Sequence, residues 1–558
     1  MNRHWLIPNQ PYSSYGAYQK SVGENAIRKA QSLSPQTVIR MIEESGLRGR
    51  GGAGFPTSRK WRTLFEHPCK RRFVVCNAAE GEPGTFKDRF LLKKNPFSTL
   101  EGMLIAAHVV GATRLFIALK ASFREELEHV HNALREIHAA GLFGGRRFTV
   151  VEGPEEYLFG EEKALLNVID GPGPLPREAH YPPYELGLYS TPGSPNPALV
   201  NNAETFAHVP NIIRDGPQAF RKLGSADTPG TIISTISGQV KRPGVYECEA
   251  GMPLAELFNH FAGGPLAGRT FKAAICGVSN GVIPAHRFDT PADFGSLRTI
   301  GSGLGSAGFV VFDDSTSMPR VAQAMARFLY VESCNQCTAC KYGLRMASTA
   351  LDELLDRTHR PGAYVLDRIL AGVEHAPQGN RCYLPVQASL LIPSIIREFR
   401  TEFEALCEEQ ELETGIILPP KMVDYDEQRH RFAYDRLQVF KNPDWTYSPP
   451  AGLVEAPATG KDCTRSESDT GDTLMAGTSQ DSKKRTDEFR TASFPVASVA
   501  LMDQELESLH KQRRALEASI LRHKQHTMIL RKELETISRR IREVELDLQR
   551  EASMEGGE

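Results

Sequence analysis

Apolar residues in the first half of the chain alternate between helical spacing and short continuous runs. Residues 34–47 have apolar side chains at helical spacing behind Ser34, which predicts a helix with a serine N-cap. Residues 100–110 predict a second, largely apolar helix. Short apolar runs predict buried strands at residues 73–78, 115–119 and 148–151. Strands that alternate with helices predict a layered α/β domain with a mostly parallel sheet.

A second pattern begins at residue 231. Apolar runs predict strands at residues 231–237, 245–248, 273–278 and 308–312, with a short helix at 254–261. Most of these strands follow one another with little helix between them, so we expect a small β-grasp-like α+β module. A helical region then begins at residues 318–332 and runs to about residue 410. This region contains a tight group of cysteines.

The two ends of the chain have different patterns. Residues 1–30 are polar and turn-rich, and they predict an arm over the surface. Residues 450–495 are rich in Ser, Thr, Asp, Gly and Lys, which predicts a disordered linker. From residue 502 to 548, Met, Leu, Ile or Val occupies a heptad seam except at Arg513, His523 and Thr527. This seam predicts a coiled coil that could support self-association.

These patterns divide the chain into five segments. We predict an α/β domain with its arm, a β-grasp-like module, a helical domain, an extension with a disordered linker, and a coiled coil, at residues 1–228, 229–317, 318–425, 426–498 and 499–550. A length of 558 residues is enough for this number of domains.

Composition excludes several classes of protein. The formal net charge is −2, so no overall field favours nucleic acid. No apolar run approaches the roughly 20 residues that span a bilayer, and the N-terminal residues lack the apolar region of a signal peptide. We therefore expect a cytoplasmic protein without direct membrane insertion, which could be peripheral to the inner membrane through partners.

Four of the ten cysteines carry a specific signal. Cys334, Cys337 and Cys340 form a C-x2-C-x2-C run, and such thiolate spacing favours an iron–sulfur cluster over zinc. Cys382, in the segment GNRCYLP, is the favoured distant fourth ligand of a [4Fe–4S] cluster. Cys407 is the competitor for that role, but its apolar helix-like surroundings indicate a core position.

Several polar segments suggest a ligand site. The segment RGRGGAGFP at residues 48–56 offers backbone N–H groups that can hold a phosphate, although a plain loop is an equal reading of this segment alone. The segment NAAEGEPG at residues 77–84 follows a predicted strand, where α/β folds place ligands. The pairs Glu161-Glu162 and Asn201-Asn202 suit hydroxyl and amide groups of a ligand. Each of these segments, taken alone, is more often a solvated surface or a helix cap.

Taken together, these segments resemble the flavin- and NADH-binding subunit of respiratory complex I and its relatives in NAD-dependent formate dehydrogenases and NAD-reducing hydrogenases. The resemblance rests on SGLRGRGGAGFP with Lys60-Trp61, and on CNAAEGEPGTFKDR, YLFGEEKALLN, LVNNAET, SGQVKRPGVYE and ESCNQCTACKYG, in the order of the family over residues 35–405. It implies a Rossmann-like FMN-binding α/β domain, an SLBB-type β-grasp module and a helical-bundle iron–sulfur domain.

The resemblance also implies roles for individual residues. FMN phosphate and ribityl would be held by Gly49, Arg50, Gly51, Gly52, Gly54 and Lys60. The FMN site would be completed by Asn77, Glu80, Tyr157, Gly160, Glu161, Asn201, Asn202 and Thr205. Glu82 and Glu162 would meet NAD(H), with Phe55 and Tyr184 as stacking groups for its adenine. The flavin would exchange hydride with NAD(H) and pass single electrons to the cluster, so no acid–base triad is required.

Three positions depart from the family pattern. Where this chain has Ala79, the family usually has Asp, and where it has Tyr181, the family often has a basic residue. The residues after Cys382 read YLPVQASLLIP, whereas the family usually has a Gly- or Asp-containing segment there. The implied activity is that of an NADH dehydrogenase (diaphorase) subunit. Its expected partners are a small thioredoxin-like [2Fe–2S] subunit and further iron–sulfur subunits. The alternative is a non-catalytic electron-transfer or scaffold subunit that keeps the cluster but binds NADH weakly.

Overall fold

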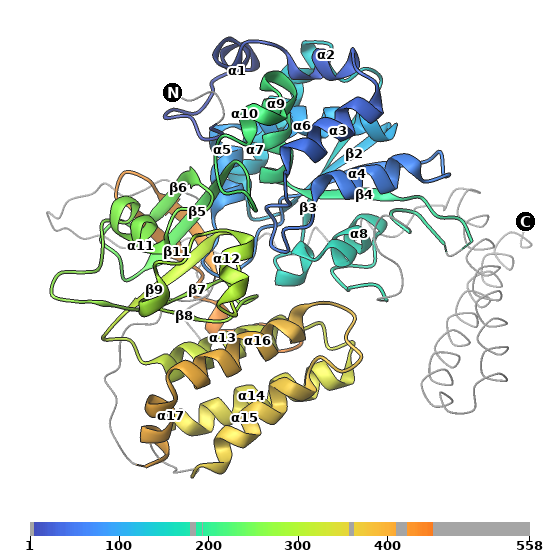
Figure 1. Ribbon diagram of the computed structural model, residues 1–558. Helices are drawn as coiled ribbons and strands as arrows, with labels where there is room; N and C mark the ends of the chain where they lie inside the picture. Colours follow the sequence, from blue (N-terminus) through green and yellow to red (C-terminus); the bar gives the residue numbers. More distant parts are fainter. Residues whose placement is uncertain (1–4, 179–185, 192, 357–361, 409–420, 450–558) are drawn as a thin grey trace, which may run out of the picture. The chain divides into compact units, whose positions relative to one another are not determined.

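The computed structural model describes residues 5–178, 186–191, 193–356, 362–408 and 421–449 (Figure 1). Met1–Ala456 forms one compact unit, which contains all of these residues. The boundaries predicted inside this unit stay a prediction. The coiled coil predicted at residues 499–550, and the linker from residue 450 on, lie outside the described residues.

The first layer is a four-stranded parallel sheet with the strand order β3-β2-β1-β4. Its strands are β1 (Phe73–Asn77), β2 (Arg114–Lys120), β3 (Arg147–Gly153) and β4 (Ala198–Asn202). In this register Asn77, the last residue of β1, pairs with Ala118 and with Asn202. The carboxyl ends of β1 and β4 therefore meet at one edge of the sheet. The parallel sheet expected from the sequence is confirmed.

Helices cover both faces of this sheet. One face packs against helices that include α6 (Pro96–Val110), α7 (Arg124–Ala139) and α9 (Ala203–Asp215), with α3 (Pro35–Ser45) and α4 (Thr57–Glu66) beside them. The other face packs against η1 (Tyr157–Gly160) and α8 (Glu162–Asp170). Two short helices, α5 (Lys87–Lys94) and α10 (Pro217–Phe220), complete this part of the chain. Because α6 lies between the sheet and other helices, it is apolar nearly all round.

The surface arm predicted at residues 1–30 is wrong for the part of it that the structure describes. Residues 15–31 form α1 (Tyr15–Val22) and α2 (Ala26–Gln31), and both helices bury residues in the main core. The hydroxyl groups of Tyr15 and Tyr18 donate to the buried carboxylate of Glu101, at 3.0 and 2.9 Å. The segment looked polar in sequence because a tyrosine hydroxyl is polar, although the ring can pack in the core when the hydroxyl has a hydrogen-bond partner.

The second layer is a five-stranded mixed sheet with the order β6-β5-β9-β7-β8. Its strands are β5 (Thr231–Gly238), β6 (Gly244–Glu249), β7 (Phe271–Cys276), β8 (Ile283–Pro284) and β9 (Gly308–Asp313). The helical turns α11 (Leu254–Glu256), η2 (Leu257–Phe261), η3 (Ala285–Arg287) and α12 (Phe294–Thr299) lie between these strands in the chain. β5 and β9 run parallel while the other pairs are antiparallel, as expected for a β-grasp-like module.

Helices dominate the third part of the chain. They are α13 (Met318–Glu332), α14 (Thr338–Leu355), α15 (Tyr364–His375), α16 (Leu384–Glu398) and α17 (Arg400–Cys407). The described residues continue with a hairpin of β10 (Met422–Asp426) and β11 (Arg431–Tyr434), and with η4 (Gln438–Phe440). Tyr425 and Phe432 of this hairpin pack on Phe86 and Phe90 beside the first sheet. The chain therefore returns from the helical part to the α/β domain.

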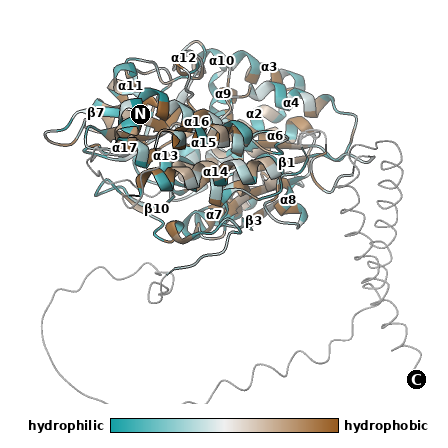
Figure 2. Cartoon of the chain, turned by 90° about the horizontal axis from the view of Figure 1, so that it is seen from below, coloured by the Kyte–Doolittle hydropathy of each residue, from teal (hydrophilic) through white to brown (hydrophobic). Residues whose placement is uncertain are grey.

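Figure 2 shows polar and apolar residues side by side on the helices, as expected for amphipathic helices that cover a core. In the part of the chain that the structure describes, we find no helix with the length and apolar character needed to span a bilayer. The cytoplasmic location stays a prediction.

Candidate functional site

A cleft lies where β1 and β4 end. It encloses about 220 Å³. The predicted binding residues that line it are Gly51, Asn77, Glu80, Glu82, Tyr157, Gly160, Glu161 and Asn202. They come from the glycine-rich loop between α3 and α4, from both strand ends and from the segment before α8. The structure therefore brings together segments that are far apart in the sequence, at the edge where parallel sheets hold ligands.

The glycine-rich loop lies tightly against β4. A Cβ atom on Gly51 would stand 3.1 Å from the Cβ of Asn202, so a side chain there would crowd the strand end. Gly54 has φ +62° and its Cβ would stand 2.7 Å from the ring of Phe294, so only glycine fits. The backbone N–H of Arg50 donates to the hydroxyl of Thr205 at 2.8 Å, which ties the loop to α9. Gly49 and Gly52 lie in this loop but do not line the cleft.

The side chain of Arg50 does not line the cleft, and its expected part in binding FMN stays a prediction. Arg50 is 2% exposed, and its guanidinium donates to the carbonyl of Pro229 at 2.7 Å. Burial lowers the pKa of this guanidinium to about 10. Arg50 therefore ties the loop to α9 through its backbone N–H and to the start of the second module through its side chain.

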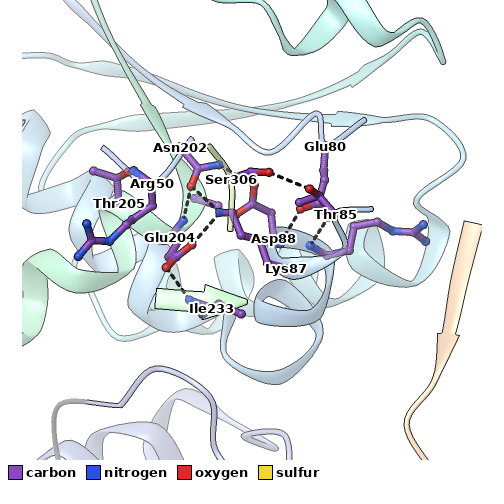
Figure 3. A network of polar contacts seen from close by, with 12 residues as sticks. Arg50, Glu80, Thr85, Lys87, Asp88, Asn202, Glu204, Thr205, Ile233 and Ser306 are labelled. Carbon is purple, nitrogen blue, oxygen red and sulfur yellow. Dashed lines mark hydrogen bonds and ion pairs between the residues drawn. The ribbon is translucent and has the colours of Figure 1, made fainter. Parts of the chain in front are cut away.

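A buried ion network underlies the cleft (Figure 3). The ammonium of Lys87 lies 2.8 Å from the carboxylate of Asp88 and 2.7 Å from that of Glu204, and it donates to Asn202 Oδ1 at 3.2 Å. Burial alone would raise the pKa of Glu204, but the Lys87 ammonium lowers it to about 2. The network fixes the Asn202 carboxamide at the end of β4.

Two carboxyl groups of the cleft cap helices. Glu80 accepts from the backbone N–H groups of Asp88 and Arg89 at 3.1 and 3.4 Å, at the start of α5. Glu161 accepts from Ala164 N at 2.8 Å, at the start of α8. Burial raises the pKa of each carboxyl group to about 7. Both groups line the cleft and therefore change protonation there near neutral pH.

Glu82 joins the three parts of the molecule. Its carboxylate accepts from the hydroxyl of Tyr157 at 2.5 Å, and from Val278 N and Ser279 Oγ of the second module at 2.8 and 2.9 Å. Gln387, on α16, donates to Tyr157 Oη at 2.7 Å and to Ser279 Oγ at 2.6 Å. The cleft is therefore closed by residues of all three parts.

The remaining predicted residues lie around the cleft without lining it. The Lys60 ammonium forms an ion pair with Glu162 and lies 5.9 Å from the ring centroid of Phe55, which is 43% exposed. Asn201 is buried, and its side-chain oxygen has no hydrogen-bond partner among the described residues. Tyr184 and Tyr181 lie outside the described residues.

The cysteines of the predicted cluster gather beside the cleft. Cys334 and Cys337 lie in the turn between α13 and α14, and Cys340 is in the first turn of α14. Arg381, directly before Cys382, donates to Gln336 Oε1 at 3.4 Å, and the Gln336 amide donates to the Cys334 sulfur at 3.3 Å, so the Cys382 segment lies against the cysteine turn. Burial raises the pKa of the Cys382 thiol. Tyr383 and Leu384, which follow Cys382 directly, line the cleft. Cys407 ends α17, and its charged neighbours are Glu404 and Glu408.

The described residues fit both cofactors expected from the sequence. Within the described ranges, no group of three or more Cys, His, Asp or Glu side chains is placed to hold a metal ion. The four gathered thiols suit a cubane, which is larger than one ion and needs its ligands farther apart. The Asn201 carboxamide oxygen and the close-packed Gly51 backbone leave polar groups for a phosphorylated flavin.

Sequence reasoning missed several residues of the cleft. The cleft is also lined by Thr85, Lys87, Asp88, Ser279, Ser306 and Gln387, none of which was expected there, and by Ala79, the position where the family usually has Asp. Lys87 and Asp88 belong to the segment GTFKDR, and two adjacent opposite charges directly after a ligand-type loop were the available signal. Ser279 and Gln387 carried no signal, because their place depends on packing between separate parts of the chain.

Known proteins match all three parts. The Nuo51 FMN-binding domain model matches residues 42–211, the SLBB domain model matches 233–278, and the NADH-ubiquinone oxidoreductase-F iron-sulfur binding region matches 320–406. The SLBB-type module expected from the sequence is thereby confirmed.

Curated relatives resemble the chain over most of their length. The second F subunit of the NADH-quinone oxidoreductase of Rhizobium meliloti is 37% identical over 405 residues, which is 70% of this chain and 94% of that protein. The F subunit of the NADH-quinone oxidoreductase of Mycobacterium bovis is 34% identical over 421 residues, which is 73% of this chain and 92% of that protein.

Solved structures also resemble the chain. A chain of an NAD+-reducing [NiFe]-hydrogenase in the H2-reduced state has a TM-score of 0.62 at 30% identity. The match covers 69% of this chain, which spans only 64% of the hydrogenase chain. The cleft, the cysteine site and the relatives agree: the chain belongs to the family of the F subunits of NADH-quinone oxidoreductase.

Proposed function

We propose that this chain is an NADH:acceptor oxidoreductase, the NADH dehydrogenase (diaphorase) subunit of a multi-subunit redox complex. The observation that carries the proposal is the position of the cysteine site. The two residues after Cys382 line the same cleft as Glu80, Glu82 and Asn202. Bound FMN would exchange hydride with NAD(H) and single electrons with a [4Fe–4S] cluster.

The residues of the chain would bind and orient these groups. The backbone of the glycine-rich loop and Asn201 would hold the phosphate and ribityl parts of FMN. Asn77 is already fixed, because its side-chain nitrogen donates to the carbonyl of Gly160 at 2.7 Å. Glu82 and Glu162 would face NAD(H), and the exposed ring of Phe55 would stack on its adenine. Cys334, Cys337, Cys340 and Cys382 would hold the cluster.

The partners follow from the same proposal. The relatives are each one subunit of a larger assembly, so further subunits are expected to receive or supply electrons. We propose a small thioredoxin-like [2Fe–2S] subunit and other iron–sulfur subunits as these partners. Neither the relatives nor the described residues favour the alternative of a non-catalytic scaffold subunit.

The test uses the full chain, prepared anaerobically with sufficient iron and flavin. We expect bound FMN, reduction of ferricyanide by NADH, and an iron–sulfur EPR signal that NADH elicits. A protein without FMN would contradict the proposal. A cluster signal that dithionite elicits and NADH does not would favour the scaffold alternative.

A further inference from the structure

Residues 421–449, called the clamp segment here, lie beyond the matched iron–sulfur region, which ends at residue 406. This segment includes β10, β11 and η4. Its hairpin rests on the α/β domain: Arg89 donates to the carbonyl of Val423 at 2.8 Å, and Lys94 forms an ion pair with Glu427 at 2.6 Å. Its second half reaches the helical part of the chain.

The second contact centres on a buried carboxylate. Glu332 is the last residue of α13, two residues before Cys334, and its side chain is 0% exposed. Its oxygens lie 2.6 Å from the ammonium of Lys421 and 2.9 Å from that of Lys441, and Gln438 donates to it at 3.0 Å. Burying a carboxylate without such partners is strongly destabilising, so the clamp segment supplies the cations that stabilise Glu332 in the interior.

The same carboxylate contacts the flavin cleft. Glu332 accepts from the backbone N–H of Tyr157 at 2.9 Å, and the hydroxyl of Tyr157 donates to Glu82. On the cysteine side, the side-chain amide of Asn335 donates to the carbonyl of Pro443 in the clamp segment. Arg327 of α13 donates to the carbonyls of Val439 and Lys441, at 3.2 and 3.3 Å. One short segment thus touches the cysteine turn and, through one carboxylate, the wall of the cleft.

We propose that the clamp segment fixes the cysteine turn against the flavin cleft, with Lys441 and Lys421 as positioning residues that act through Glu332. This inference rests on the proposed function. Electron transfer between two fixed centres slows steeply as the distance between them grows, so a displaced cysteine turn would slow reduction of the cluster. The cation of Lys441 also favours the more negative, reduced cluster.

The test compares Lys441→Met with Lys94→Met in the full chain, loaded with FMN and cluster. Each variant removes one ammonium from an ion pair between the clamp segment and the rest of the protein. Lys94 pairs with Glu427, whereas Lys441 pairs with Glu332. In Lys441→Met we expect NADH to bleach the flavin at the parental rate, and cluster reduction to slow severalfold. The midpoint potential of the cluster should become more negative. Lys94→Met should match the parent in all three measurements.

A second measurement needs no electron transfer. Hydrogen exchange at the Tyr157 amide should be faster in Lys441→Met, because the acceptor Glu332 loses one of its anchors. Gln438→Leu removes only a neutral hydrogen bond to the same carboxylate, and it decides the matter if Lys441→Met does not fold. It should show faster exchange at Tyr157 and slower cluster reduction at smaller size, with the parental cluster potential because both ammonium groups remain.

Three outcomes overturn the proposal. The first is a Lys441→Met protein with the parental cluster potential and transfer rate or, where only Gln438→Leu folds, a Gln438→Leu protein with the parental transfer rate. The second is joint loss of FMN and cluster in the folded variant, which would make the segment a general stabiliser. The third is equal behaviour of Lys94→Met and Lys441→Met. A parental chain whose flavin NADH does not bleach would instead contradict the proposed function itself.

Discussion

The cysteine site and the flavin cleft are adjacent, but they are built differently. Three of the four cysteines lie within seven residues of one another, in one turn and the helix that follows it. The cleft takes its lining from the glycine-rich loop, two strand ends, the segment before α8, the second sheet and α16. The cysteine site therefore depends on local spacing, whereas the cleft depends on how whole elements pack. Substitutions in the two regions should therefore have different effects on cofactor content and on stability.

The largest effect is expected at the cysteine site. Cys337→Ser should abolish assembly of the [4Fe–4S] cluster, because one thiolate of the run is lost, while FMN remains bound. Iron and sulfide analysis with flavin absorbance would measure this. Cys407→Ser, at the end of α17, is the matched control and should keep the cluster. Loss of FMN together with the cluster would show that the two regions are not independent.

The next effect concerns the ion network of the cleft. Lys87→Met leaves the buried carboxylates of Asp88 and Glu204 without their shared cation, and it should lower the free energy of unfolding by about 3–5 kcal/mol. Chemical denaturation would measure the loss. Arg40→Met breaks an exposed ion pair with Glu44 and should cost about 0.5 kcal/mol or less. A similar cost for both variants would contradict a structural role of the network.

A smaller effect depends on pH. The raised pKa of Glu80, about 7 against an ordinary 4.5, means that the folded state holds a proton that the unfolded state releases. The free energy of unfolding should therefore fall as pH rises from about 4.5 to about 7, by on the order of 3 kcal/mol from this group. Glu80→Gln should reduce that slope in denaturation experiments across this range. The exposed control Glu44→Gln should keep the parental slope.

The smallest effect is expected from the tail. Both regions belong to the unit Met1–Ala456. Deletion of residues 496–558 should therefore leave the NADH:ferricyanide rate and the cluster content unchanged. The same deletion should lower the total mass of the assembled particle by more than the deleted residues of all its chains account for, if the predicted coiled coil drives self-association. A large loss of activity would show that one of the two regions needs the tail.

The sequence alone indicated most elements of the fold. The predicted strands at residues 73–78, 115–119 and 148–151 correspond to β1, β2 and β3. The strand β4 was not predicted, because its apolar part is short and ends in two asparagines. The N-terminal helices were also missed, since their buried tyrosines carry hydroxyl groups that read as polar until their partner Glu101 is known.

The candidate site shows the same difference between what local sequence indicates and what tertiary packing decides. The C-x2-C-x2-C run is fixed by spacing within one segment, so the sequence by itself determined three of the cysteines and the kind of cluster they suit. Tertiary structure placed the Cys382 segment near them, turned the Arg50 side chain to Pro229, and joined Glu82 to Ser279 and Tyr157. The reason is physical. Backbone geometry sets which neighbours in sequence can converge, but a contact between distant segments exists only after the core has packed and has chosen which polar groups to bury together.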